Sequence, residues 1–144
     1  MIDTGLLAPG AVLALWTLAM LFWMAGTRFS AFGKAGIDVK TAPPGGRGVD
    51  LEGTLPAQVN WKSHNYTHLL EQPTIFYAII TFLTLSGGAA PLTKGLAWAY
   101  VALRIVHSIW QSTVNTIPVR FTIFLLASLC LFALAILAVI ATLG

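Results

Sequence analysis

Charged residues are scarce in this sequence. Asp, Glu, Lys and Arg make up 9% of its 144 residues, whereas soluble domains carry about 25%. Hydrophobic residues make up 57%, and a soluble chain of this length could not bury so much apolar surface, because small domains hide a limited share of what they expose. The composition therefore predicts an integral membrane protein with the lipid bilayer as its surroundings.

Other absences exclude further classes. The single cysteine, Cys130, cannot form an intrachain disulfide. The net charge is +3, but the basic residues are scattered, so we expect no nucleic-acid partner, which needs clustered Lys and Arg to follow phosphates. The sequence contains no phosphate-binding Walker motif, dinucleotide glycine motif or Gly-x-Ser-x-Gly nucleophile motif.

Four stretches are long and apolar enough to cross about 30 Å of hydrocarbon as helices, which takes roughly 20 residues. They cover about residues 6–27, 65–86, 92–112 and 117–143. The sequence thus predicts an all-α protein, residues 1–144 forming a single membrane domain built as a four-helix transmembrane bundle. Lone charges inside these stretches are features to explain rather than reasons to reject a span.

The one substantial loop, residues 29–53, is predicted to be polar and mostly irregular, and the second helix is expected to begin near Leu55, before Pro56. Basic residues concentrate around this loop, while the second loop holds only Lys94. Because basic loops stay on the cytoplasmic side, we expect the first loop to be cytoplasmic and both termini to be non-cytoplasmic. The basic residues in and beside the first loop are Arg28, Lys34, Lys40, Arg47 and Lys62.

This topology places every ionisable group of the spans in the cytoplasmic half of the bundle. Glu71 and Arg104 form the natural ion pair, which leaves Arg120 unpaired as a candidate anion receptor. An isolated charge at the bilayer centre costs about 3 kcal/mol or more, so pairing or a wet cavity is expected. Two other interpretations stay open: Arg120 could reach the interface as an anchor, and Glu71 could simply join two helices.

The histidines suggest a second arrangement. His64, His68 and Glu71 are spaced i, i+4 and i+7 and share one helix face; with His107 they include the ligand types of many metal sites. Such spacing arises easily by chance, so interfacial polar residues are the favoured interpretation and no metal is expected. Pro73 removes a helix hydrogen bond and frees the carbonyl of Leu69, which predicts a kink beside Glu71.

Two short motifs resemble a known family. Arg104-Ile-Val-His107 in the third span, followed by Pro118-Val-Arg120 at the start of the fourth, resembles the MAPEG family of membrane-associated proteins in eicosanoid and glutathione metabolism. Glu71 followed by Pro73 and Phe76 is similar as well. The likeness extends over nearly the whole chain in span number and loop sizes, and it suggests a bacterial-type member in the inner membrane.

The resemblance implies a homotrimer with active sites between subunits, and glutathione as the thiol substrate. By this resemblance Arg120 is the catalytic residue that stabilises the thiolate. The residues expected to bind the thiol are Arg104, His107, Glu71, Arg28 and His68.

Some residues depart from the family pattern. Thr67 and His68 stand where glutathione-using members carry Arg-Asn, Gln111 replaces a common tyrosine, and Phe121 stands where serine is frequent.

Three functions follow. The leading one is a membrane enzyme, a transferase or peroxidase, that joins glutathione or another thiol to a lipophilic small molecule. The second is a non-catalytic protein that binds a lipid or a protein partner, which the departures favour. The third is a metal-dependent membrane enzyme.

Overall fold

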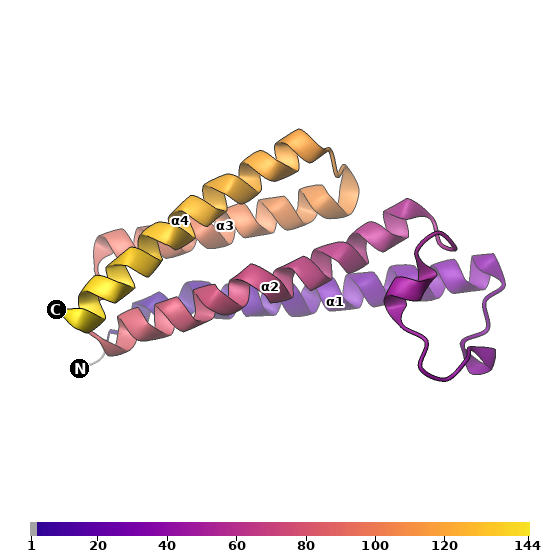
Figure 1. Cartoon of the computed structure of the whole chain (residues 1–144), viewed down its shortest axis with the longest axis horizontal. Helices are drawn as coiled ribbons and strands as arrows, with labels where there is room; N and C mark the ends of the chain where they lie inside the picture. The colour runs from indigo at the N-terminus through magenta and orange to yellow at the C-terminus, as the bar shows by residue number, and fades with distance from the viewer. Residues whose placement is uncertain (1–2) are drawn as a thin grey trace.

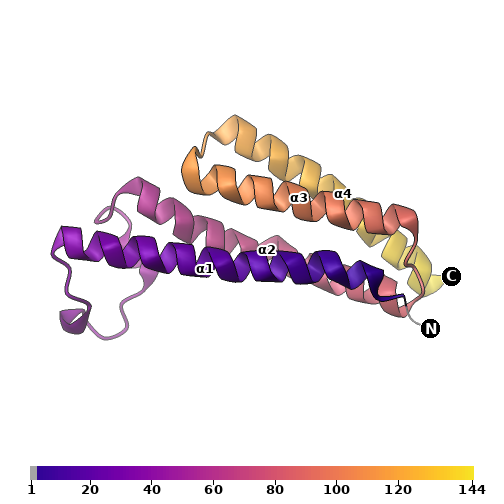
Figure 2. The same ribbon diagram turned by 180° about the vertical axis from the view of Figure 1, so that it is seen from behind.

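The computed structural model describes residues 3–144, and these form four long α-helices. They are α1 (Leu7–Ala35), α2 (Ala57–Leu85), α3 (Pro91–Thr113) and α4 (Ile117–Leu143). The predicted all-helical fold with four helices is confirmed. In Figures 1 and 2, α1 lies beside α2 and α3 beside α4, and both chain ends lie at one end of the bundle.

Proline and glycine define the helix ends. Pro91 opens α3 and Pro118 lies in the first turn of α4, where proline's missing N–H costs nothing. Gly36 ends α1 in the left-handed conformation, with φ 66°, which glycine adopts without a steric penalty.

At the end that holds the termini, Lys94 Nζ lies 2.7 Å from Asp3 Oδ2, and this hydrogen bond holds the pKa of Asp3 below its usual value.

The irregular loop is shorter than predicted. The expected loop began at Phe29, but α1 continues to Ala35, because nothing before Gly36 breaks the helix and Lys34 in the last turn favours its negative end. Between α1 and α2 the chain makes two short 3₁₀ turns, Val39–Thr41 and Gly48–Leu51. The ends of α1 and α2 that this connection joins extend beyond α3 and α4 (Figure 1).

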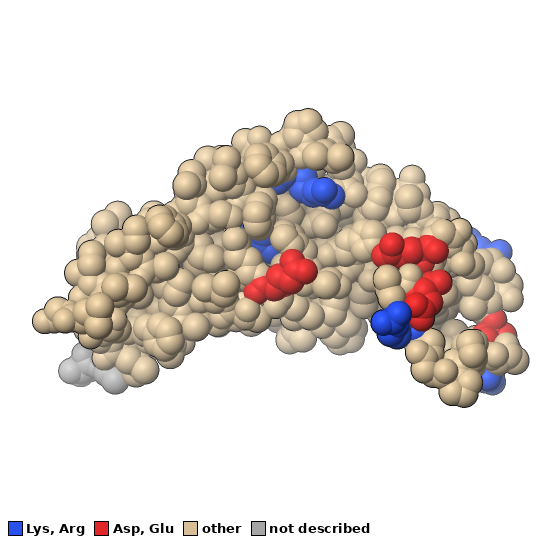
Figure 3. Space-filling view, in the orientation of Figure 1, with Lys and Arg blue, Asp and Glu red and all other residues tan. Residues whose placement is uncertain are grey.

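The helices pack around a continuous apolar core, whose fully buried members include Leu13, Phe76, Leu83, Tyr100 and Leu134. Large apolar side chains are also exposed over much of the bundle, as expected for a surface that faces lipid rather than water. Figure 3 shows that the charged atoms visible on one face lie toward the middle of the bundle and at its loop end.

Not all four helices are equally apolar. The segments Thr4–Ala35 and Ile117–Leu143 are long and apolar enough to cross a membrane, and among the described residues only these two meet that measure. With 29 and 23 residues, α2 and α3 are also long enough to cross the hydrocarbon layer, because a helix rises about 1.5 Å per residue. However, they carry most of the bundle's polar side chains, so the four predicted spans divide into two apolar helices and two that hold polar groups.

Candidate functional site

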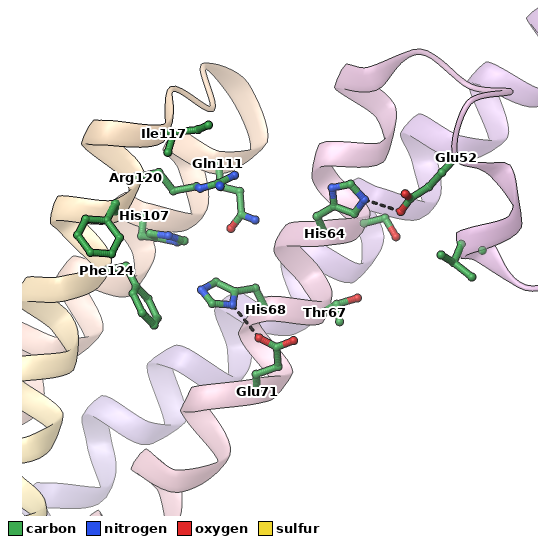
Figure 4. Close-up of a pocket in the computed structure, with 14 residues that line it drawn as sticks. Glu52, His64, Thr67, His68, Glu71, His107, Gln111, Ile117, Arg120 and Phe124 are labelled. Atoms are coloured by element: carbon green, nitrogen blue, oxygen red, sulfur yellow. Dashed lines mark hydrogen bonds and ion pairs between the residues drawn. The ribbon is translucent and has the colours of Figure 1, made fainter.

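A polar cavity of about 750 Å³ opens where the α3–α4 pair diverges from α2. Its walls come from α2, from the ends of α3 and α4 near their connecting turn, and from the 3₁₀ turn Gly48–Leu51 (Figure 4). The lining side chains are Val49, Glu52, Ser63, His64, Thr67, His68, Glu71, His107, Gln111, Ile117, Arg120, Phe121 and Phe124, together with Gly48. The cavity lies at the end that the basic loop predicts to be cytoplasmic.

Arg120 lies on the cavity wall and makes no contact with a carboxylate. Its Nη1 donates to Asn115 Oδ1 at 2.7 Å, and no ion pair within residues 3–144 includes it. Asn115 occupies the turn between α3 and α4 in the left-handed conformation (φ 57°), and its N–H bonds the carbonyl of Trp110 at 2.8 Å. A neutral amide therefore holds Arg120 in place and leaves its charge uncompensated.

Arg104 lies behind the cavity wall, fully buried. Its Nη2 donates to the carbonyl of His68 at 2.9 Å, and its Nη1 lies 3.3 Å from His68 Nε2. Its guanidinium also faces the ring of Phe124 at 5.8 Å. The carbonyl that it binds is adjacent to that of Leu69, which Pro73 was expected to free.

The predicted Glu71–Arg104 ion pair is wrong, because His68 lies between them. His68 Nδ1 pairs with Glu71 Oε2 at 2.8 Å, and its other ring nitrogen faces Arg104. His68 and Glu71, three residues apart on α2, meet on one helix face, whereas the Glu71 side chain stays 61% exposed. His68 also approaches His107, with the ring centroids 5.2 Å apart.

Arg28, predicted to contact the thiol, instead holds the loop. Its Nη2 donates to the carbonyl of Gly48 at 2.9 Å and to Ser63 Oγ at 3.0 Å. Arg28 does not line the cavity, and a Cβ added at Gly48 would collide with the guanidinium unless Arg28 or the loop shifted. The effect of Arg28 on the cavity is indirect, since Gly48 and Val49 form part of the wall.

The histidines do not form the arrangement needed for a metal. His64 Nε2 lies 2.6 Å from Glu52 Oε1 at the mouth of the cavity, away from the His68–Glu71 pair (Figure 4). Within residues 3–144 no group of three or more His, Cys, Asp or Glu side chains is arranged to hold a metal ion.

Three features of the site escaped the sequence reasoning. Glu52 and Val49 come from the loop between α1 and α2, and no periodic pattern in the sequence indicates that this loop folds over α2. Asn115 could have been identified from the sequence, because Asn after a helix often takes the left-handed conformation. Asn115 also lies only five residues before Arg120. Gln111 lines the cavity, and its buried Oε1 has no hydrogen-bond partner among the described residues.

A model of the MAPEG family matches residues 6–140 of the chain. The chain belongs to the MAPEG family. The resemblance inferred from Arg104, His107, Arg120 and Glu71 is thereby confirmed, and this MAPEG member is a membrane protein with two helices long and apolar enough to cross a bilayer. Searches of curated proteins and of solved structures find no match to the chain.

Proposed function

We propose that this MAPEG member is a membrane enzyme that binds an anionic thiol, with glutathione as the leading candidate, and joins it to a lipophilic electrophile or peroxide. The observation that carries the proposal is Arg120, a cation on the cavity wall whose one side-chain hydrogen-bond partner within residues 3–144 is neutral. A nearby positive charge favours the thiolate, which is the nucleophilic form of a thiol. His107 and Gln111 lie on the same wall and can donate to the thiol's polar groups.

The apolar part of the cavity suits the second substrate. Ile117 and Phe121, near the start of α4, both line the cavity and are more than half exposed, at 68% and 61%. A lipophilic molecule dissolved in the bilayer could therefore reach the cavity without crossing water. Its reactive atom would then meet the thiolate beside Arg120.

We further propose a homotrimer whose subunits complete the site. In the isolated chain the Glu71 side chain is 61% exposed, and it lies within the predicted second span. Glu71 also lines the polar cavity, but any part of the carboxylate that faced lipid would cost about 3 kcal/mol or more. Thr67, Thr74 and Ala78 are exposed on the same side of α2, and such small residues allow helices to approach closely.

The homotrimer is tested by crosslinking. Cysteine at position 74 in a Cys130→Ser background should give crosslinked species in native membranes. A matched cysteine at Leu143, which lies at the end of α4 and is 84% exposed, serves as the control. Monomer alone with the first variant would contradict the assembly.

We also propose that all four helices span the bacterial inner membrane with the loop of residues 36–56 in the cytoplasm. The basic loop supports this orientation, and both chain ends at one end of the bundle are consistent with it (Figure 1). In the Cys130→Ser background, cysteine introduced at Lys94 should react with an impermeant reagent in intact cells, and cysteine at Lys40 should not. The reverse pattern would overturn the orientation.

The thiol proposal is tested with Arg120→Lys, matched to Arg47→Lys, because Arg47 is 76% exposed in the loop and does not line the cavity. Lys cannot reproduce the planar pairing of Arg with an anion. Glutathione is titrated against the protein in detergent and thiolate absorbance is followed. Arg120→Lys should weaken thiolate formation at least roughly tenfold, about 1.4 kcal/mol, with Arg47→Lys unchanged. Equal behaviour of the two variants and the native chain would leave Arg120 as a membrane anchor.

One observation favours the non-catalytic alternative. The cavity-lining residues include no tyrosine, and the hydroxyl of the nearby Tyr100 is directed at Gln72 Oε1, 3.2 Å away. The described cavity thus lacks a phenol to donate to a thiolate. If the anion that Arg120 binds is the carboxylate of a lipid, a fatty acid should displace glutathione and no conjugate should form with a general electrophile.

A further inference from the structure

A second cavity of about 700 Å³ lies on a different part of the bundle. It follows the last turns of α1, from Phe22 to Ala35, and is closed on its other side by the start of α2, at Pro56 and Val59. None of its lining residues belongs to the polar cavity. Gly26 lines this groove, and a Cβ added there would meet no atom within 4 Å, so the space beside Gly26 is open.

The chemistry of the groove changes along its length. Phe22 and Trp23 form an apolar aromatic end, Thr27 and Ser30 follow with hydroxyl groups, and Lys34 lies at the outer end. From Phe22 to Lys34 the helix rises about 18 Å at 1.5 Å per residue. Because the first span is predicted to end near residue 27, the groove crosses from the edge of the hydrocarbon through the headgroup layer.

A second lysine stands over the aromatic end. Lys62 Nζ lies 5.4 Å from the centroid of the Trp23 ring, and it donates to the carbonyl of Gln58 at 2.8 Å. Neither Lys34 nor Lys62 forms an ion pair within residues 3–144. No acidic side chain lines the groove, so its charge is positive and uncompensated.

We propose that this groove binds an anionic glycerophospholipid of the adjoining leaflet. One acyl chain lies against Phe22 and Trp23, and the phosphate lies near Lys62, with the rest of the headgroup directed along the hydroxyls toward Lys34. An aromatic side chain at the level of the headgroups with lysines beside it is the usual composition of a membrane interface, and anionic lipids are attracted to such basic positions. A zwitterionic headgroup would place its own cation against the lysines.

The test uses the full chain, delipidated in detergent and titrated with phosphatidylglycerol or phosphatidylcholine of identical acyl chains, with bound lipid counted by native mass spectrometry. The native chain should prefer phosphatidylglycerol at least about tenfold, as expected for two lysines beside an anionic headgroup. Gly26→Leu should abolish binding by filling the groove. Gly33→Leu is the matched control, because Gly33 also lies on α1 with open space at its Cβ but does not line the groove.

The charge is tested separately. Lys34→Gln with Lys62→Gln should remove the preference for phosphatidylglycerol, because Lys34 lines the groove and Lys62 lies over the ring of Trp23, which lines it. Lys40→Gln with Lys94→Gln should retain the preference, because these lysines neither line the groove nor lie over one of its aromatic rings. Soluble glycerol phosphate should not compete, since it lacks the acyl chain that the aromatic end binds.

Three results would overturn the proposal: equal affinity for both lipids, equal effects of Gly26→Leu and Gly33→Leu, or competition by glycerol phosphate. A change in oligomeric mass with Gly26→Leu and no change in lipid binding would assign the groove to a second copy of the chain instead. Glutathione titration of the Gly26→Leu variant keeps the two sites distinguishable, because failure of lipid binding leaves the Arg120 result intact.

Discussion

Gly48→Ala is the sharpest perturbation of the loop that forms part of the cavity wall. The carbonyl of Gly48 accepts from Arg28 Nη2, and a Cβ at this position would lie 3.1 Å from Arg28 Cζ and Nη2 and closer still to Nη1. The guanidinium cannot retreat while it also donates to Ser63 Oγ. The added methyl group should therefore displace either Arg28 or the loop.

The expected cost follows from the bonds at risk. A hydrogen bond to a charged group contributes about 1.5–3 kcal/mol, and water replaces part of it because the Arg28–Gly48 contact is only partly buried. The backbone of Gly48 is not in the left-handed region, so alanine gains about 0.4–1 kcal/mol by restricting the unfolded chain. A net destabilisation of about 1–2 kcal/mol is expected, and it should be confined to the loop.

Hydrogen exchange measures that local change. The amides of Asp50 and Glu52 bond carbonyls within the turn, at 3.0 Å each, and their exchange should accelerate about tenfold for each 1.4 kcal/mol lost. Gly46→Ala is the matched control, because its nearest obstacle is the carbonyl of Pro43 at 3.4 Å. In an Arg28→Ala background Gly48→Ala should no longer accelerate exchange, and it should slow exchange slightly because alanine restricts the unfolded chain. Equal exchange in the two glycine variants, or additivity with Arg28→Ala, would refute the role given to Arg28.

Two further predictions concern charge. The hydrogen bond from Lys94 is the main cause of the lowered pKa of Asp3 in the folded chain, so the stabilisation of the fold by this pair is present above the usual pKa of 3.8 and is lost as pH falls through the folded value. The melting temperatures of the native chain and of Lys94→Gln should therefore differ at pH 6 and converge in acid. A difference in melting temperature that persists at low pH would contradict this origin. Glu71 should couple to His68 by roughly 0.2–1 kcal/mol in a double-mutant cycle of thermal stability, while Glu71 and Arg104 should be additive within about 0.5 kcal/mol, so stronger coupling to Arg104 would restore the direct ion pair.

The helices and the starts of α3 and α4 were predictable from the sequence because their causes are local. Pro91 and Pro118 place the starts of α3 and α4 within a residue or two of the predicted spans. The end of α1 was not predictable from hydropathy, because the helix continues past the apolar stretch until Gly36 stops it. Local conformational preference, rather than the width of the membrane, sets that boundary.

The partners of the charged side chains were less predictable, because they depend on helix rotation. Depth along the bundle correctly brought Glu71, Arg104 and His107 to one region. It could not show that His68 faces α3 while Glu71, three residues later, turns outward. Likewise the partner of Arg28 lies in a loop with no periodic pattern, so only the folded chain reveals that the carbonyl of Gly48 accepts a hydrogen bond from Arg28.

The left-handed turn at Asn115 has a consequence for how the protein can change. Glycine is the residue best suited to that backbone conformation, so Asn115→Gly should raise the melting temperature of the protein or leave it unaltered. The same change removes the amide oxygen that holds Arg120 and lets the guanidinium sample other rotamers. A search for thermostable variants would thus accept glycine here, whereas a search for thiol binding would reject it, and comparing the two outcomes would show which demand asparagine serves at this turn.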